Sequence, residues 1–161
     1  MVSFSLWRIA PETREYKADD LSGGGAAKYP GRWNAPGEYV VYAAETIALA
    51  VLETAAHIDS GGLPLNRFVV KIDVPMKVWQ AREQIDPEKI DVAWSAVPAG
   101  KASVDVGSNW YKSSRSTLLT VPSVIVPEAR VVLINATHAD ARTITSRTIR
   151  PFDYNKLFRG A

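Results

Sequence analysis

The chain has 161 residues, of which 47% are apolar and 22% charged, proportions typical of one soluble domain with its own core. The absence of cysteine excludes disulfide bonds, thiolate zinc sites and cysteine nucleophiles, and it fits a reducing compartment. The formal net charge of +2 is too small to indicate binding to nucleic acid.

The charges are unevenly distributed along the chain. Residues 130–161 contain six basic and two acidic residues, whereas residues 1–129 contain 13 basic and 15 acidic ones. The basic residues of the C-terminal part are Arg130, Arg142, Arg147, Arg150, Lys156 and Arg159. They form either a solvated surface or a docking face for an acidic partner or a phosphate-bearing ligand.

Neither a targeting signal nor a membrane span is evident. Residues 1–9 lack the basic and apolar regions of a signal peptide, and no run of 18 apolar residues occurs. We therefore expect a cytoplasmic protein that does not bind a membrane. The two histidines, His57 and His138, do not have a metal-ligand spacing, so we also expect no metal site.

The N-terminal part combines a strand with a glycine-rich loop. Alternating apolar residues predict a strand over residues 4–9. Residues 23–37 are dense in glycine and proline, which predicts a loop. This loop carries Tyr29, Arg32 and Trp33, and such side chains among glycines are typical of a binding loop.

The central part alternates strands with one helix. Residues 39–44 are almost entirely apolar and predict a buried strand, and residues 67–74 alternate as a second strand does. Apolar residues at helical spacing predict a helix over residues 46–58, with Thr46 as its N-cap and residues 61–62, both glycine, ending the segment.

Residues 75–117 have the weakest pattern. We expect a short helix near residues 87–94, and we interpret residues 100–117, with their glycines and paired serines, as a mobile flap over the site. Three tryptophans are expected to anchor the core or a lid: Trp79, Trp94 and Trp110.

The C-terminal part predicts three more strands. They cover residues 118–126, 130–135 and 144–150, and a turn at Pro127 joins the first two. With no repeat or linker in the chain, the whole pattern predicts a single α+β (mixed α/β) domain over residues 1–161, with central strands and few helices.

Three charged side chains are candidates for a functional site. Glu53 interrupts an otherwise apolar helix, so its carboxylate is either exposed or held at the floor of a pocket. Arg32, next to Gly31 in the loop, either grips a phosphate or bonds loop carbonyl groups. Arg8 is a further cation in an apolar neighbourhood.

Two neutral side chains complete the candidate set. Tyr42 lies in the predicted buried strand, where a core tyrosine bonded to the backbone is the simplest interpretation. Ser123 either meets the backbone or faces a ligand, and no G-x-S-x-G pattern marks it as a hydrolase nucleophile. Without cysteine, metal ligands or a Rossmann or Walker motif, this set favours electrostatic handling of a phosphorylated, sugar-containing ligand.

Several blocks of the sequence, in order, resemble the RES domain family, which is named after an arginine, a glutamate and a serine. The blocks run nearly from end to end and are residues 31–37, 41–44, 48–53, 119–127, 133–138 and 152–158. Two departures bear on loop shape: Pro30 replaces the first glycine of the family's Gly-Gly-Arg-Trp-Asn, and Ala136 replaces the proline of its Asn-Pro-x-His.

The resemblance implies a bacterial toxin whose fold is similar to that of ADP-ribosyltransferases and whose partner is an antitoxin of the Xre or ParS type. It implies that NAD⁺ is the substrate and that hydrolysis or phosphorolysis of the nicotinamide–ribose bond depletes cellular NAD. The alternatives are an ADP-ribosyltransferase acting on a protein target and a non-catalytic binding module in which Glu53 and Arg32 form a structural pair.

The family's motif positions assign roles to the candidate residues. Glu53 would stabilise the cationic ribose, and Arg32 and Arg8 would hold the pyrophosphate. Tyr42 would pack on the nicotinamide ring, and Ser123 would bond the ribose or the amide. Glu53, Arg32 and Ser123 are therefore the expected catalytic residues, and all five residues are expected to bind NAD⁺.

Overall fold

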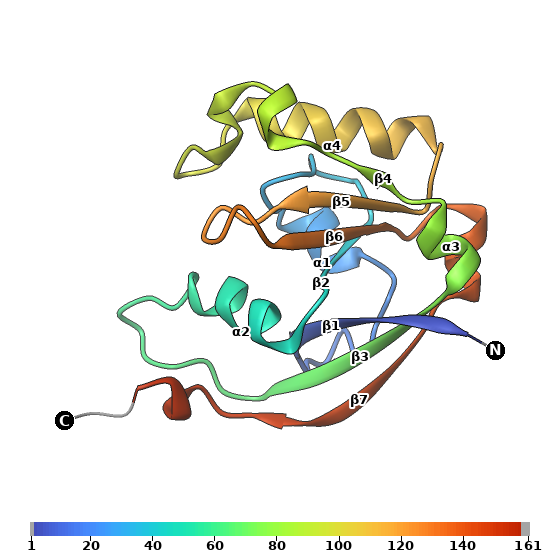
Figure 1. The fold of residues 1–161 in the computed structure, drawn as a ribbon. Helices are drawn as coiled ribbons and strands as arrows, with labels where there is room; N and C mark the ends of the chain where they lie inside the picture. Colours follow the sequence, from blue (N-terminus) through green and yellow to red (C-terminus); the bar gives the residue numbers. More distant parts are fainter. Residues whose placement is uncertain (1, 159–161) are drawn as a thin grey trace.

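The computed structural model describes residues 2–158 and contains one mixed seven-stranded sheet (Figure 1). The strand order is β4-β5-β6-β2-β1-β3-β7, and every neighbouring pair is antiparallel except β4 with β5. The strands are β1 (Ser3–Pro11), β2 (Val40–Ala44), β3 (Arg67–Pro75), β4 (Glu83–Gln84), β5 (Leu118–Pro122), β6 (Arg130–Asn135) and β7 (Thr145–Phe152). This architecture confirms the predicted α+β fold class.

The helices are short except for one that covers the β4–β5–β6 part of the sheet (Figure 1). The α-helices are α1 (Gly24–Lys28), α2 (Ile47–Ala55), α3 (Met76–Gln80) and α4 (Lys101–Ser113). The 3₁₀ helices are η1 (Pro87–Lys89), η2 (Val92–Ser95), η3 (Ala139–Thr143) and η4 (Tyr154–Leu157). No helix within residues 2–158 is long and apolar enough to span a membrane.

The core consists of two apolar clusters on opposite faces of the sheet. Val40 and its neighbour Val41 belong to different clusters, and so do Val69 and Val70, because successive side chains of a strand point to opposite faces. The first cluster also contains residues of α2 and α4. Because Trp33 belongs to it as well, the predicted binding loop packs against the core. The predicted tryptophan anchors Trp79, Trp94 and Trp110 are all buried.

The predicted strands are confirmed with shifts of one or two residues at their ends, except that β5 ends at Pro122 instead of residue 126. Three other segments differ from expectation. The predicted loop contains the short helix α1, and α2 begins after its N-cap Thr46 as expected but ends at Ala55. Residues 87–94 form two 3₁₀ turns instead of one helix. The predicted flap is wrong, because residues 101–113 form α4, the longest helix, which packs on the core.

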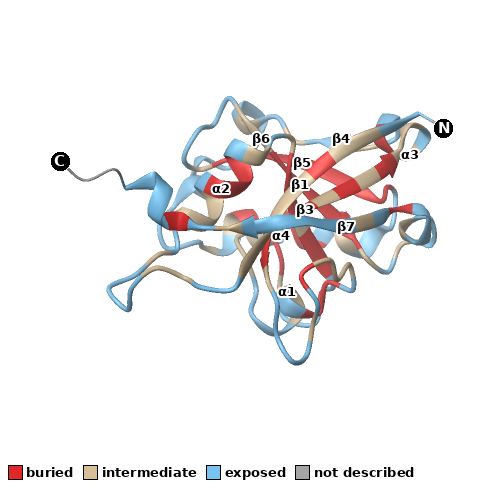
Figure 2. Cartoon of the chain, turned by 90° about the horizontal axis from the view of Figure 1, so that it is seen from below, coloured by how far each residue is buried: buried red, intermediate tan, exposed pale blue. Residues whose placement is uncertain are grey.

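The edge strand β7 is exposed along almost its whole length (Figure 2). Several features of β7 keep other strands from pairing with this open edge. They are an irregularity in its register with β3 and the residues Arg147, Arg150 and Pro151. Four strand spacings, about 19 Å, separate β7 from β6, on which Arg130 lies. The basic C-terminal residues therefore do not form one patch, and Arg159 lies outside the described residues.

Candidate functional site

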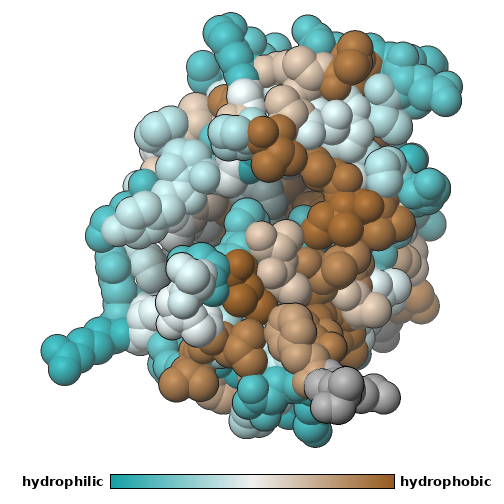
Figure 3. Space-filling view, turned by 90° about the vertical axis from the view of Figure 1, so that its left-hand side faces the viewer, coloured by the Kyte–Doolittle hydropathy of each residue, from teal (hydrophilic) through white to brown (hydrophobic). Residues whose placement is uncertain are grey.

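A cavity of about 1000 Å³ opens on the face shown in Figure 3, between the sheet and three loops. Its walls are formed by β1, β2, α2 and the chain segments around residues 23–36, 97–99 and 122–125. All five candidate residues line it: Arg8, Arg32, Tyr42, Glu53 and Ser123. The fold therefore brings together side chains that are up to 115 residues apart in sequence, counting from Arg8 to Ser123.

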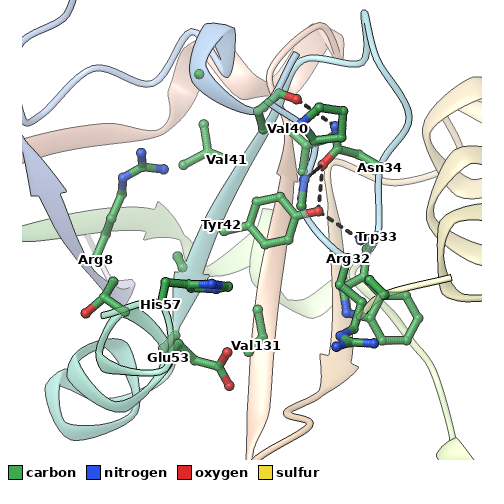
Figure 4. A pocket seen from close by; sticks show the side chains of 18 of the residues that line it. Arg8, Arg32, Trp33, Asn34, Val40, Val41, Tyr42, Glu53, His57 and Val131 are labelled. Atoms are coloured by element: carbon green, nitrogen blue, oxygen red, sulfur yellow. Dashed lines mark hydrogen bonds between the residues drawn. The ribbon is translucent and has the colours of Figure 1, made fainter. Parts of the chain in front are cut away.

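Glu53 lies on the last turn of α2, with its carboxylate directed into the cavity (Figure 4). The hydroxyl group of Ser123 donates a hydrogen bond of 2.5 Å to Oε1 of Glu53. Within residues 2–158 no hydrogen bond is recorded for Oε2, so this oxygen is available to a ligand. The carboxylate is thus half-buried and held through Oε1, while Oε2 faces the cavity without a partner in the described residues.

Ser123 has no bonding capacity left for a ligand. Its Oγ donates to Glu53 and accepts two backbone N–H bonds, from Ile125 and Val126, each 3.1 Å long. A hydroxyl group has one donor and two acceptor sites, and all three are occupied. The side chain is also only 1% exposed. Ser123 therefore positions Glu53 and the following turn, and the expected bond from Ser123 to ribose or amide would require one of these bonds to break.

Arg32 bonds backbone carbonyl groups, which is the structural one of the two roles considered for it from the sequence. Its Nη1 donates to the carbonyl oxygens of Trp94 at 2.9 Å and Ala96 at 2.6 Å, which ties the binding loop to the segment around η2. Burial lowers the pKa of Arg32, while the negative charge of Glu53 acts in the opposite direction. No ion pair joins Arg32 to Glu53 among the described residues, so the structural pair expected of a binding module does not form.

The hydrogen bonds of Arg8 are incomplete. It projects from β1 into the cavity on the opposite side of Tyr42 from Arg32 (Figure 4). Its buried Nε has no hydrogen-bond partner in the described part of the chain. Burial lowers the pKa of Arg8 and the nearby Asp20 opposes this effect, but a guanidinium group stays charged at neutral pH. A guanidinium group that lines a cavity and has an unsatisfied N–H group is suited to an anionic ligand.

Tyr42 presents its ring to the cavity and uses its hydroxyl group to hold the loop (Figure 4). The hydroxyl donates to Oδ1 of Asn34 at 2.7 Å and accepts from the backbone N–H of Trp33 at 3.0 Å. Burial raises the pKa of Tyr42 above its ordinary value. A Cβ atom at Gly31 would lie 2.7 Å from the tyrosine ring, which explains why glycine precedes Arg32. Pro30, which replaces the first glycine of the family's motif, is exposed.

Two residues of the loop were not singled out from the sequence. Asn34, 1% exposed, accepts from the backbone N–H of Gly31 at 2.9 Å as well as from Tyr42. Glu38, 6% exposed, accepts from the backbone N–H of Ala35 and from the Ser108 hydroxyl group. Asn34 falls on the last residue of the family's Gly-Gly-Arg-Trp-Asn motif, which is the sequence signal for it. For Glu38 the signal is a polar residue next to an apolar strand, which is weak.

The two histidines have separate surroundings. His57 is exposed at the cavity rim, four residues after Glu53. Nδ1 of His138 bonds the Thr117 hydroxyl group at 2.9 Å and accepts the N–H of Asp140, which caps η3. Among residues 2–158 no group of three or more His, Asp or Glu side chains is placed to hold a metal ion.

Comparison with known proteins gives consistent matches along the chain. The RES domain family matches residues 5–155. A Prs ADP-ribosylating toxin of Sphingobium sp. is 52% identical over 94% of each chain, and a toxin Res of Yersinia enterocolitica is 31% identical over 92% of this chain and 94% of that protein. A chain in the crystal structure of the M. tuberculosis MbcT–MbcA toxin–antitoxin complex has the same fold, with a TM-score of 0.63 and 16% identity over 97% of this chain and 89% of that chain. The chain therefore belongs to the RES domain family of toxins.

Proposed function

We propose that the protein breaks the nicotinamide–ribose bond of NAD⁺ and transfers ADP-ribose to a protein acceptor. The observation that carries this proposal is the Glu53 carboxylate, fixed through Oε1 by Ser123 and directed into a cavity of about 1000 Å³. Breaking a glycosidic bond to nicotinamide leaves positive charge on the ribose, and a carboxylate held in place stabilises that charge without first having to reorganise.

The free oxygen of Glu53 fits this chemistry. Because Ser123 fixes Oε1, Oε2 can accept a ribose hydroxyl or lie near the developing cation. Nicotinamide departs as a neutral molecule, so the leaving group needs no strong general acid. The electron pair of the broken bond goes to the pyridine nitrogen of nicotinamide, and the nucleophile of the acceptor forms the new bond to the ribose and loses a proton.

Arg8 is the side chain best suited to the pyrophosphate. Its guanidinium group lines the cavity and its buried Nε has no partner among residues 2–158, so a phosphate oxygen would supply the missing bond. Arg32 already donates to two carbonyl oxygens through Nη1, which leaves its other N–H groups for the ligand. We therefore assign the larger share of phosphate binding to Arg8 and a combined structural and binding role to Arg32.

Tyr42 supplies an apolar wall. Its hydroxyl group is bonded to Asn34 and Trp33, which fixes the position of a ring that faces the cavity. A fixed aromatic ring can stack on the planar nicotinamide group and hold it near Glu53.

The choice of a protein acceptor is supported by the full-length relative that is 52% identical and is named a Prs ADP-ribosylating toxin. The cavity is also lined by exposed apolar side chains, Tyr29 at 75%, Val97 at 81% and Ile125 at 43%, which suit a protein surface better than bulk water. Transfer to water or to phosphate is the second candidate, because it begins with the same bond cleavage at Glu53. We propose an antitoxin of the Xre or ParS type as the cytoplasmic partner, and the toxin–antitoxin neighbour of the same fold supports a partner of this kind.

Product analysis separates these reactions. The purified protein is incubated with NAD⁺ alone, with phosphate, and with Prs protein, and nicotinamide, ADP-ribose and the mass of Prs are measured. We expect nicotinamide release together with a mass increase on Prs that corresponds to ADP-ribose. Nicotinamide release without a change in Prs would favour hydrolysis, or phosphorolysis if it depends on phosphate, and no nicotinamide release under any condition would contradict the proposal.

A further inference from the structure

We propose that Glu38 is a positioning residue: its buried carboxylate, held by Ser108 of α4, fixes the loop that carries Arg32 and holds the hydroxyl group of Tyr42 at the NAD⁺ cavity. This inference rests on the proposed function only in naming NAD⁺ as the ligand. Neither Glu38 nor Ser108 is among the residues that line the cavity, so both act through other residues.

Glu38 is an unusual group to bury. It is 6% exposed, and none of the ion pairs formed within residues 2–158 includes it. Removing a carboxylate from water without a cation is costly unless strong hydrogen bonds compensate. Here Oε1 accepts the backbone N–H of Ala35 at 2.7 Å and Oε2 accepts the Ser108 hydroxyl group at 2.5 Å. The position violates the rule that buried charges are paired, and such violations gather at functional sites.

The two bonds of Glu38 connect two elements that are 70 residues apart. Ala35 belongs to the loop before β2, and Ser108 to the buried face of α4. The same face of α4 makes two further contacts with the loop. The Ser103 hydroxyl group donates to the carbonyl oxygen of Arg32 at 2.8 Å, and Gly107 lies directly against the carbonyl oxygen of Trp33.

The loop passes this constraint to the cavity wall. Asn34, next to Ala35, accepts from Tyr42, and Trp33 donates its backbone N–H to the same phenol. A chain of hydrogen bonds therefore runs from Ser108 through Glu38 and the backbone of residues 33–35 to the hydroxyl group of Tyr42. Arg32, whose carbonyl oxygen is bonded to Ser103, lies on the same short segment.

The location predicts which kinetic constant changes. The loop carries Arg32 and holds the hydroxyl group of Tyr42, whereas Glu53 is carried by α2 and held by Ser123. Loosening the loop should therefore weaken NAD⁺ binding more than it slows the chemical step. A loss of global stability alone would lower the amount of folded enzyme, and so reduce the apparent kcat while leaving KM unchanged.

The experiment compares Glu38→Ala, Glu38→Gln and Ser108→Ala with the control Ser116→Ala. Ser116 is a buried serine that bonds Leu118, Glu83 and Trp110, the last near the C-terminal end of α4, and none of these residues lines the cavity. Its loss should reduce stability without removing any bond to the loop. We expect Glu38→Ala to raise the KM for NAD⁺ about 10- to 100-fold, because small displacements of binding groups have effects of this size. Glu38→Gln should stay within a few-fold of wild type, since an amide can accept from Ala35 and donate to Ser108.

Hydrogen exchange provides a second measurement that needs no turnover. The backbone N–H groups of Trp33 and Ala35 are donors in this network, so a peptide covering residues 31–37 should exchange faster in Glu38→Ala and Ser108→Ala than in Ser116→Ala. An unchanged KM in Glu38→Ala, or exchange no faster than in the control, would overturn the inference. If the wild-type protein does not consume NAD⁺, the proposed function fails, and the exchange experiment still decides whether Glu38 fixes the loop.

Discussion

Ser123 and Glu53 are 70 residues apart in sequence and are joined by a hydrogen bond of 2.5 Å between the serine hydroxyl group and Oε1 of the carboxylate. The bond links the end of β5 to the last turn of α2. Because the serine oxygen also accepts from Ile125 and Val126, the strand end and the following turn are held by the same atom. One side chain thus determines where the carboxylate lies.

We predict that Ser123→Ala lowers kcat more than it changes the KM for NAD⁺. The substitution frees the carboxylate and leaves the two N–H groups of Ile125 and Val126 without their partner. Losing these two hydrogen bonds should reduce the free energy of unfolding by about 1–3 kcal/mol, at the usual net value of about 0.5–1.5 kcal/mol for each bond. Steady-state kinetics and urea denaturation of the same preparations measure both effects. A raised KM with an unchanged kcat would instead indicate that Ser123 binds the substrate.

Glu53→Gln tests the carboxylate itself. The amide has the same shape and can still accept the Ser123 hydroxyl bond, so the fold should persist with little change in melting temperature. Loss of the negative charge should lower the rate of nicotinamide release by at least about 100-fold, by analogy with other groups that stabilise transition-state charge. Release at the wild-type rate would exclude Glu53 from the reaction.

The sequence predicted the strands, the α2 N-cap and the five cavity residues, but it could not reveal α4 or the bonds of Ser123. The buried face of α4 consists mainly of Ser103, Gly107, Ser108 and Trp110, so it lacks the regular apolar spacing that marks a helix. Its small residues serve close contact with the loop, which only the folded structure explains. The hydrogen bonds of Ser123 and Arg32 likewise join residues 70 and 62 positions apart, and no local pattern specifies them.

Gly107→Ala tests the close contact between α4 and the loop. A Cβ atom at this position would overlap the carbonyl oxygen of Trp33, and a backbone group cannot move aside as a flexible side chain can. We expect the free energy of unfolding to fall by about 1–3 kcal/mol, the usual cost of overpacking. The control is Gly25→Ala in α1, where a Cβ atom meets no atom of residues 2–158 within 4 Å, so alanine should be neutral or slightly stabilising. Equal melting temperatures of the two variants would contradict the close packing.

Arg8 and Arg32 should differ when each is replaced by alanine. Arg8→Ala removes a cation whose buried Nε has no partner in the part of the chain that the structure describes, so NAD⁺ affinity should fall while stability is maintained or rises. Arg32→Ala removes two bonds to Trp94 and Ala96, so we expect both lower NAD⁺ affinity and lower stability. Calorimetric titration with NAD⁺ and thermal unfolding separate the two patterns. An Arg8→Ala variant with wild-type affinity would remove Arg8 from the proposed phosphate site.

The raised pKa of Tyr42 makes a prediction about alkaline stability. A tyrosine in the unfolded chain loses its proton near pH 10, whereas burial makes the Tyr42 phenol in the folded protein retain its proton to higher pH. Below about pH 10 both states are protonated, and the contribution of this residue to stability is complete. As the pH rises further, only the unfolded state releases the proton, so the free energy of unfolding falls, by up to about 1.4 kcal/mol per pH unit.

Tyr42→Phe removes this proton and should therefore give a flatter dependence of stability on pH above 10 than the wild-type protein. At pH 7 the same variant should be less stable, because Asn34 and the N–H of Trp33 lose their shared partner. Urea denaturation between pH 7 and about pH 11 measures both effects, and Tyr29→Phe, at a side chain that is 75% exposed, is the control expected to follow the wild-type curve. Parallel curves for Tyr42→Phe and wild type above pH 10 would show that the Tyr42 phenol ionises in the folded state as it does in the unfolded chain.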